Sequence, residues 1–215
     1  MDCTRSVDVL RTHNSFKRDD WGAIALMFNR LFKKDPMKAP ARAVYTAIVE
    51  AARRPVFYGP DGAPDTVDGR FDLIILHTIL VFRRVRSAGE EGRHFNQLVF
   101  DILFDDMDAA LREMGTGDLS VGKKIREMGE AFYGRARAYE AALDEGEATV
   151  LAVAIERNLF ALEEDAGESE PAPDPEPSPA AQRLAAYAGK ASAYLEDQDV
   201  SEIMSGDAPQ FPASL

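Results

Sequence analysis

Sulfur and imidazole ligands are scarce in this sequence of 215 residues. Cys3 is the single cysteine, and the histidines are His13, His77 and His94. A disulfide needs two cysteines, and a structural zinc site needs about four Cys or His ligands in suitable spacing. We therefore expect neither a disulfide framework nor a metal or other cofactor, and a reducing compartment is permitted.

Long apolar runs are also missing. A membrane-spanning helix needs about 20 apolar residues, whereas the longest run here, Leu73 to Phe82, is half that length and contains two polar residues. The apolar run at 21–28 is too short for a signal-peptide core and is followed by basic residues instead of a cleavage site. We expect a soluble, cytoplasmic chain that can lie peripherally at a membrane surface.

Basic residues are outnumbered, since 25 Lys and Arg face 37 Asp and Glu, which gives a formal net charge of -12. Specific nucleic-acid binding is not expected, because it needs a clustered basic surface. The charge is uneven, however. Residues 4–42 hold nine basic and four acidic side chains, whereas residues 163–176 hold seven acidic side chains and no basic one. This asymmetry is typical of a chain whose N-terminal part contacts an anionic surface.

The apolar residues recur at three- and four-residue spacing, which predicts helices. We expect helices at Trp21–Phe32, 41–53, 66–86, 94–114, 120–143 and 147–162. The helix at 66–86 is apolar on nearly every side and should lie at the centre, with Asp65 and Asp68 as a polar cap at its start. Ser120 is expected to cap the helix that it begins. No useful strand pattern is present, so the fold class is all-α, a single compact helical bundle.

The ends of the chain differ from this bundle. Residues 1–16 are polar and aperiodic, so we expect a disordered N-terminal segment followed by a helical domain at 17–165; whether translation starts at Met1 or Met27 stays open. Residues 166–180 form an acidic, Pro-rich segment, which predicts an extended linker. Residues 181–215 hold a short amphipathic helix and a tail. This helix either docks back or binds a partner.

Two features could carry chemistry, and each also has a structural interpretation. Asp105, Asp106 and Asp108 could hold magnesium against a diphosphate, but their spacing does not fit that motif and no second acidic helix faces them. We favour a solvated or ion-paired face. His77 lies in an apolar helix with no ligand at i+4, which favours a hydrogen-bonded core histidine. Gly134 inside a helix suggests close approach by a neighbouring helix or a client.

Several sequence blocks resemble one known family. They are Ala52 to Tyr58, Pro64 to Asp72 leading to His77, Phe104 to Asp108 leading to Glu113, and Met128 to Arg135 leading to Tyr139. In this order they resemble the ubiquinol-cytochrome c chaperone family over about 43–143, and the resemblance covers neither the linker nor the last helix. It implies a non-enzymatic assembly factor that receives newly made cytochrome b near the ribosome and the inner membrane. A small partner protein assists mitochondrial members.

The resemblance and the physical pattern together select candidate residues. Methionine and aromatic stripes are core by default, but they also give adaptable apolar surface of the kind that holds varied apolar segments. The expected client- or partner-binding residues are Tyr58, Asp65, Asp68, Arg70, Phe71, Asp72, His77, Phe104, Met107, Met128, Phe132, Tyr133 and Arg135. The expected contacts with an anionic membrane are Phe28, Arg30, Leu31, Phe32, Lys33 and Lys34.

Two other functions remain open from the sequence. One is a membrane-surface adaptor without chaperone activity, which would use the basic, amphipathic helix near Phe32. The other is a magnesium-dependent prenyl-diphosphate enzyme built on the aspartate cluster.

Overall fold

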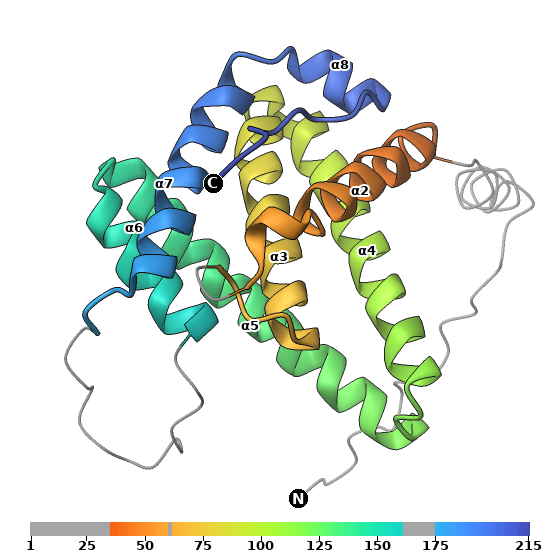
Figure 1. The fold of residues 1–215 in the computed structure, drawn as a ribbon. Coiled ribbons are helices and arrows are strands. Elements are labelled where there is room, and N and C mark those ends of the chain that lie inside the picture. The colour runs from red at the N-terminus through yellow and green to blue at the C-terminus, as the bar shows by residue number, and fades with distance from the viewer. Residues whose placement is uncertain (1–34, 60–61, 161–174) are drawn as a thin grey trace, which may run out of the picture. The chain divides into compact units, whose positions relative to one another are not determined.

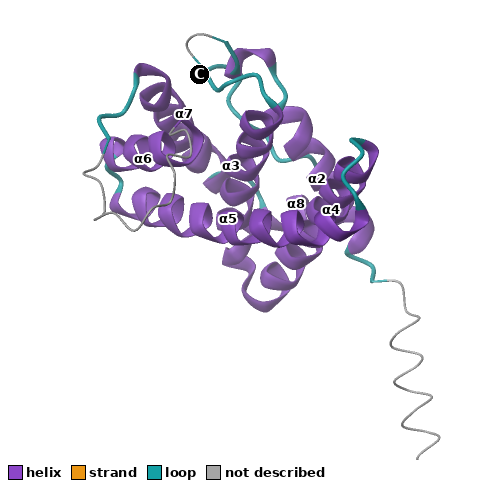
Figure 2. Cartoon of the chain, turned by 90° about the horizontal axis from the view of Figure 1, so that it is seen from below, coloured by secondary structure: helices purple, strands orange, loops and turns teal. Residues whose placement is uncertain are grey.

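Helices dominate the computed structural model, which describes residues 35–59, 62–160 and 175–215. The predicted all-α class is confirmed (Figure 2). The helix expected at Trp21–Phe32, the disordered segment 1–16 and the proposed membrane contacts lie outside the described residues. None of the helices described is both long enough and apolar enough to cross a membrane.

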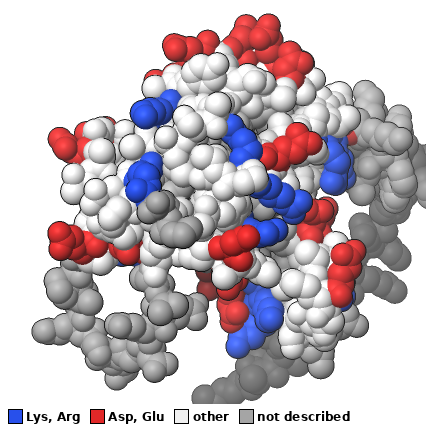
Figure 3. All heavy atoms as spheres, in the orientation of Figure 1, with Lys and Arg blue, Asp and Glu red and all other residues white. Residues whose placement is uncertain are grey.

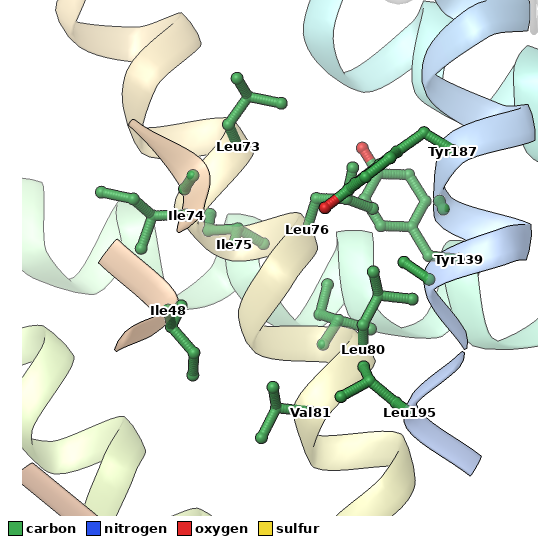
Figure 4. Close-up of a cluster of buried hydrophobic side chains, with 14 of the residues drawn as sticks. Ile48, Leu73, Ile74, Ile75, Leu76, Leu80, Val81, Tyr139, Tyr187 and Leu195 are labelled. Carbon is green, nitrogen blue, oxygen red and sulfur yellow. The ribbon is translucent and has the colours of Figure 1, made fainter. Parts of the chain in front are cut away.

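Helix α3 (Val67–Val85) is the centre of the described fold, as its apolar sequence predicts (Figure 1). Helices α2 (Lys38–Ala52), α4 (Gly89–Glu113), α5 (Asp118–Glu145) and α7 (Pro179–Glu196) all pack against it. Figure 4 shows Ile48 of α2, Tyr139 of α5 and Tyr187 of α7 gathered around its side chains. Leu73, Ile75 and Val81 are fully buried. Each such side chain contributes about 1.5–3 kcal/mol of apolar burial.

The start of α3 differs from the expected cap. Thr66 is the N-cap residue, and its hydroxyl accepts a hydrogen bond of 3.1 Å from the Gly69 backbone amide. The prediction that Asp65 and Asp68 form the cap is wrong, because Asp65 is engaged by Arg70 at 2.7 Å. Asp68 lies in the first turn, where a carboxylate is favoured by the positive end of the helix.

Helices α4 and α5 are joined by a short turn and pack against each other. Helix α4 begins five residues before the expected His94, because the turn η2 (Arg86–Ala88) and the positive φ of Gly89 redirect the chain there. Ser120 is not a cap: α5 starts at Asp118, with Gly117 at the N-cap position. Its C-terminus is Gly146 in the left-handed conformation. A Cβ on Gly134 would meet nothing within 4 Å, so the predicted close approach of a neighbouring helix is wrong.

The C-terminal helix docks back onto the bundle. Helix α6 (Ala148–Ile155) continues into a π-helical turn (Glu156–Phe160), and α7 packs on both α6 and α3. The Ser178 hydroxyl caps α7 and donates a 2.6 Å hydrogen bond to the Glu156 carboxylate, which joins the start of α7 to the end of α6. Helix α8 (Val200–Ser205) then packs against α2 and α3.

His77 fastens α7 to the central helix. It is fully buried, with Nδ1 2.8 Å from the Leu73 carbonyl oxygen and Nε2 2.9 Å from the Tyr187 hydroxyl. A carbonyl only accepts, so Nδ1 carries the proton and Nε2 accepts from Tyr187. Phe57 and Phe211 place their rings edge-on to the imidazole, at centroid distances of 5.2 and 5.0 Å. This geometry agrees with the structural interpretation of His77.

The buried imidazole makes folding stability depend on pH. Burial lowers the pKa of His77 from 6.5 to about 4, and the nearby Arg54 charge acts in the same direction. Between these values the unfolded chain binds a proton that the folded chain does not, so stability is full above pH 6.5 and falls as the pH drops toward 4. The loss amounts to about 3 kcal/mol, at 1.36 kcal/mol per pKa unit.

We expect His77→Gln to show a flatter dependence of unfolding free energy on pH between 6.5 and 4 than the parent chain, measured by urea denaturation. His94→Gln is the matched control, since His94 is exposed. Burial raises the pKa of the Asp72 carboxyl, which acts in the opposite sense, but all three proteins contain it and the comparison cancels it. Equal slopes for His77→Gln and the parent would contradict this account.

Gly69 and Gly134 give a second test, because both lie inside helices but differ in available space. A Cβ on Gly69 would lie 2.2 Å from the Pro64 carbonyl oxygen, whereas one on Gly134 meets open space. Gly69→Ala should therefore destabilise the chain by about 2 kcal/mol. Gly134→Ala should stabilise it by about 0.5–1 kcal/mol, because alanine favours the helix. Urea midpoints that move in the same direction would refute this difference.

Candidate functional site

Aromatic rings gather where α4 lies against α5. Phe100 stacks on Phe104 with centroids 4.4 Å apart, and it meets Phe132 edge-on at 5.1 Å and Tyr133 at 5.6 Å. Phe82 of α3 adds a further ring to the cluster, with its ring centroid 6.0 Å from that of Phe132. We call these five residues the aromatic seam. It brings together three predicted client-binding residues, Phe104, Phe132 and Tyr133.

The aromatic seam is only partly covered. Phe132 is buried, but Phe100 and Phe104 are half-buried and Tyr133 is 59% exposed. The predicted Met107 and Met128 are half-buried and lie one helical turn along α4 and α5 from Phe104 and Phe132. The inner members of the methionine and aromatic stripes are therefore core, and their outer members are accessible.

Ion pairs fix α5, and with it one side of the seam, to α3. Asp72 and Arg135, both predicted site residues, pair at 2.9 Å and are almost fully enclosed. Arg135 also donates to the Asn158 carbonyl oxygen at 3.1 Å. Farther along, Arg83 pairs with Asp144, and Arg86 pairs with Glu140 at 2.9 Å. The Asp72–Arg135 pair is buried, so loss of either partner would leave an uncompensated charge.

The balance of forces at Asp72 is visible in its pKa. Burial raises the pKa of this carboxyl to about 6, while the Arg135 charge and hydrogen bond lower it and the Asp68 charge raises it. Asp68 lies four residues earlier on the same helix, so the two carboxylates share one face. The pair thus positions α5 at some cost in desolvation.

A second group of predicted residues surrounds the start of α3. The Arg70 guanidinium lies 5.8 Å from the centre of the Tyr58 ring and pairs with Asp65. The Tyr58 hydroxyl donates to the Ala52 carbonyl oxygen at 2.9 Å. Asp65, Arg70 and Asp68 are exposed, whereas Phe71 is half-buried. An exposed pair of this kind contributes little to stability, so these charges remain accessible to a partner.

His77 belongs to neither surface, because it is fully buried. It cannot contact a partner in this conformation. The structure therefore divides the predicted site residues among the aromatic seam with its two methionines, the ion pair behind the seam, the start of α3, and the core.

A cavity of about 370 Å³ lies between the ends of α3, α5 and α7, lined in part by Arg83, Arg84 and Arg86. Its guanidinium groups already have partners. Arg84 donates to the Gln198 carbonyl oxygen and the Ser87 hydroxyl, and the other two form the ion pairs with α5. These arginines therefore hold helix ends together.

Two members of the aspartate cluster on α4 have partners. The Tyr45 hydroxyl of α2 donates to Asp106 at 2.7 Å, and Asp108 pairs with Arg112 at 2.6 Å. Burial and the hydrogen bond to Asp106 raise the pKa of Tyr45. Among the described residues, no group of three or more His, Cys, Asp or Glu side chains is close enough to hold a metal ion. The interpretation of the cluster as a solvated or ion-paired face agrees with these contacts.

Two important residues were missed in the sequence. Phe100 lies at the centre of the seam, and its spacing of four from Phe104 could have shown that they share a face. Tyr45, which ties α2 to α4, gave no sequence signal, because its partner lies 61 residues away.

On the face shown in Figure 3, acidic and basic side chains are interspersed.

A sequence model described as ubiquinol-cytochrome C chaperone matches residues 62–211. The match continues past Leu143 and includes α7 and α8, contrary to the expectation that the resemblance stops before the last helix.

The crystal structure of the Cbp3 homolog from Brucella abortus is similar to this chain, with a TM-score of 0.68 and 33% identity, over 88% of this chain and 97% of that one. Ubiquinol-cytochrome-c reductase complex assembly factor 1 from Xenopus laevis is 25% identical over 60% of this chain and 64% of its own length. The mouse protein of that name is also 25% identical, and the matched region spans 43% of its length. The chain belongs to the ubiquinol-cytochrome c chaperone family.

Proposed function

We propose that this chain is a non-enzymatic chaperone that binds newly made cytochrome b and assists assembly of the ubiquinol-cytochrome c reductase complex. The observation that carries the proposal is the accessible aromatic seam in a member of this family. Cytochrome b consists of very apolar spans, which need a cover of apolar surface before they are inserted or assembled. Half-buried rings and methionines provide such a cover without being permanently exposed.

The remaining partners belong to the same proposal. The chain works in the cytoplasm and peripherally at the inner membrane, where the basic segment before Arg42 meets anionic lipid. The ribosome and a small assembly protein are the other partners that we propose. The charged residues at the start of α3, Asp65, Asp68 and Arg70, are suited to a protein partner, since exposed charges favour correct orientation during association.

In-cell photo-crosslinking tests the client and the surface together. A photoreactive residue at Tyr133 should capture cytochrome b during its synthesis, and one at Phe104 should do so more weakly because that position is half-buried. The matched control is Tyr194 on α7, which is 50% exposed. Equal capture from Tyr194 and Tyr133 would contradict the assignment of the seam, and capture without any cytochrome b would contradict the client.

Deletion of the gene tests the function independently of the surface. Mature cytochrome b should fall while its transcript stays intact. A Tyr133→Ser chain should restore the protein level only in part, whereas Tyr194→Ser should restore it fully, because neither exposed side chain is needed for folding. Normal levels of the assembled complex in the deletion strain would refute the proposal.

A further inference from the structure

Carboxylates border one side of the aromatic seam. Asp101, Asp105 and Asp108 follow each other at four- and three-residue spacing, so they form a row on α4 next to Phe100 and Phe104. Asp101 and Asp105 are exposed. The Gln97 amide is an uncharged partner of Asp101, and Asp105 has no partner among the described residues. Asp108 pairs with Arg112 at 2.6 Å.

The whole of α4 shares this charge. It carries seven carboxylates and two guanidiniums. Asp106 does not contribute to the row, since it points toward α2 and accepts a hydrogen bond from Tyr45. Negative potential is therefore concentrated along the solvent side of α4, where water and salt leave it available to a partner's cations.

The other side of the seam has a different sign. On α5, Arg126, Glu130 and Arg137 have the helical spacing that places them on the same side as Tyr133. Arg126 and Glu130 approach each other at 4.0 Å, and Arg137 is exposed. A helix lying along the seam would thus meet carboxylates on its α4 side, apolar rings beneath it, and a weakly basic edge on its α5 side.

We propose that the seam recognises an apolar helix that ends in a group of Lys or Arg residues, and that the α4 carboxylates hold those cations. This inference rests on the proposed function and deepens it. Membrane spans have this chemistry at their cytoplasmic ends, where Lys and Arg are enriched within about 15–20 residues of the span. The apolar rings would bind the helix, and the acidic row would orient it and favour this end over others.

Two labelled peptides test the proposal with the full chain. One is a 16-residue Leu/Ala helix that ends in three lysines, and the other is the same helix ending in three glutamates. Fluorescence anisotropy at low salt should show that the lysine peptide binds roughly five- to ten-fold more tightly, and added salt should reduce the difference.

Charge reversal then locates the effect. Asp101→Lys with Asp105→Lys should reverse the preference between the two peptides. Glu202→Lys with Asp207→Lys changes the net charge equally at exposed positions of α8 and its following turn, and should leave the preference in place. Circular dichroism checks that all variants are folded.

Each outcome decides the inference. If both peptides bind equally, or if the α8 variant loses the preference as fully as the α4 variant, the acidic row is not a recognition element, and the proposed chaperone function stands without it. If neither peptide binds, the seam takes up no apolar helix, which overturns this inference and the proposed binding surface together.

Discussion

The burial of residues 72–81 of α3 on all sides is the constraint on which the remaining structure depends. Its consecutive apolar residues leave no face that can be solvated, so α2, α4, α5 and α7 must all cover it. This requirement brings α4 and α5 together along one side of α3, and the rings of α4 and α5 that cannot reach α3 pack on each other. The aromatic seam is therefore a consequence of how the central helix is covered, with Phe82 as the link between the core and the surface.

Polar contacts then fix the position of each covering helix relative to its neighbours. Asp72 and Arg135 fix α5, His77 and Tyr187 fix α7, and Tyr45 with Asp106 fixes α2 against α4. Each contact joins residues far apart in the sequence, and two of the three are buried. Because a buried polar group is costly without its partner, these contacts favour one arrangement over alternatives of similar apolar burial. A rigid frame of this kind can present apolar surface without collapsing around it.

Most helices could be predicted from the sequence, since apolar periodicity reports which face is covered. The starts of helices could not. Asp65 is a plausible cap from sequence, but it pairs with Arg70, and the Thr66 hydroxyl oxygen caps α3 instead. Ser120 was expected to cap α5, but the helix begins earlier and Gly117 occupies the N-cap position. The docking of α7 could not be predicted from the sequence, because His77, which accepts the hydrogen bond from Tyr187, lies 110 residues before it.

The candidate site was predicted in part for the same reason. The resemblance and the stripe pattern named Phe104, Phe132 and Tyr133, which do come together, but nothing in the sequence showed that Phe100 completes the cluster. His77 was included because it follows a family block, yet its environment is the core. Spacing along one helix could be read from the sequence, whereas burial depends on which helices lie across from it.

Hydrogen–deuterium exchange shows directly whether the aromatic seam is the surface that binds cytochrome b. The purified full chain would be compared alone and with detergent-solubilised cytochrome b, and backbone protection would be followed segment by segment. We expect new protection in 97–108 and 126–137, on the two helices that form the seam, with α7 unchanged. New protection confined to α7, or none in α4 and α5, would contradict it.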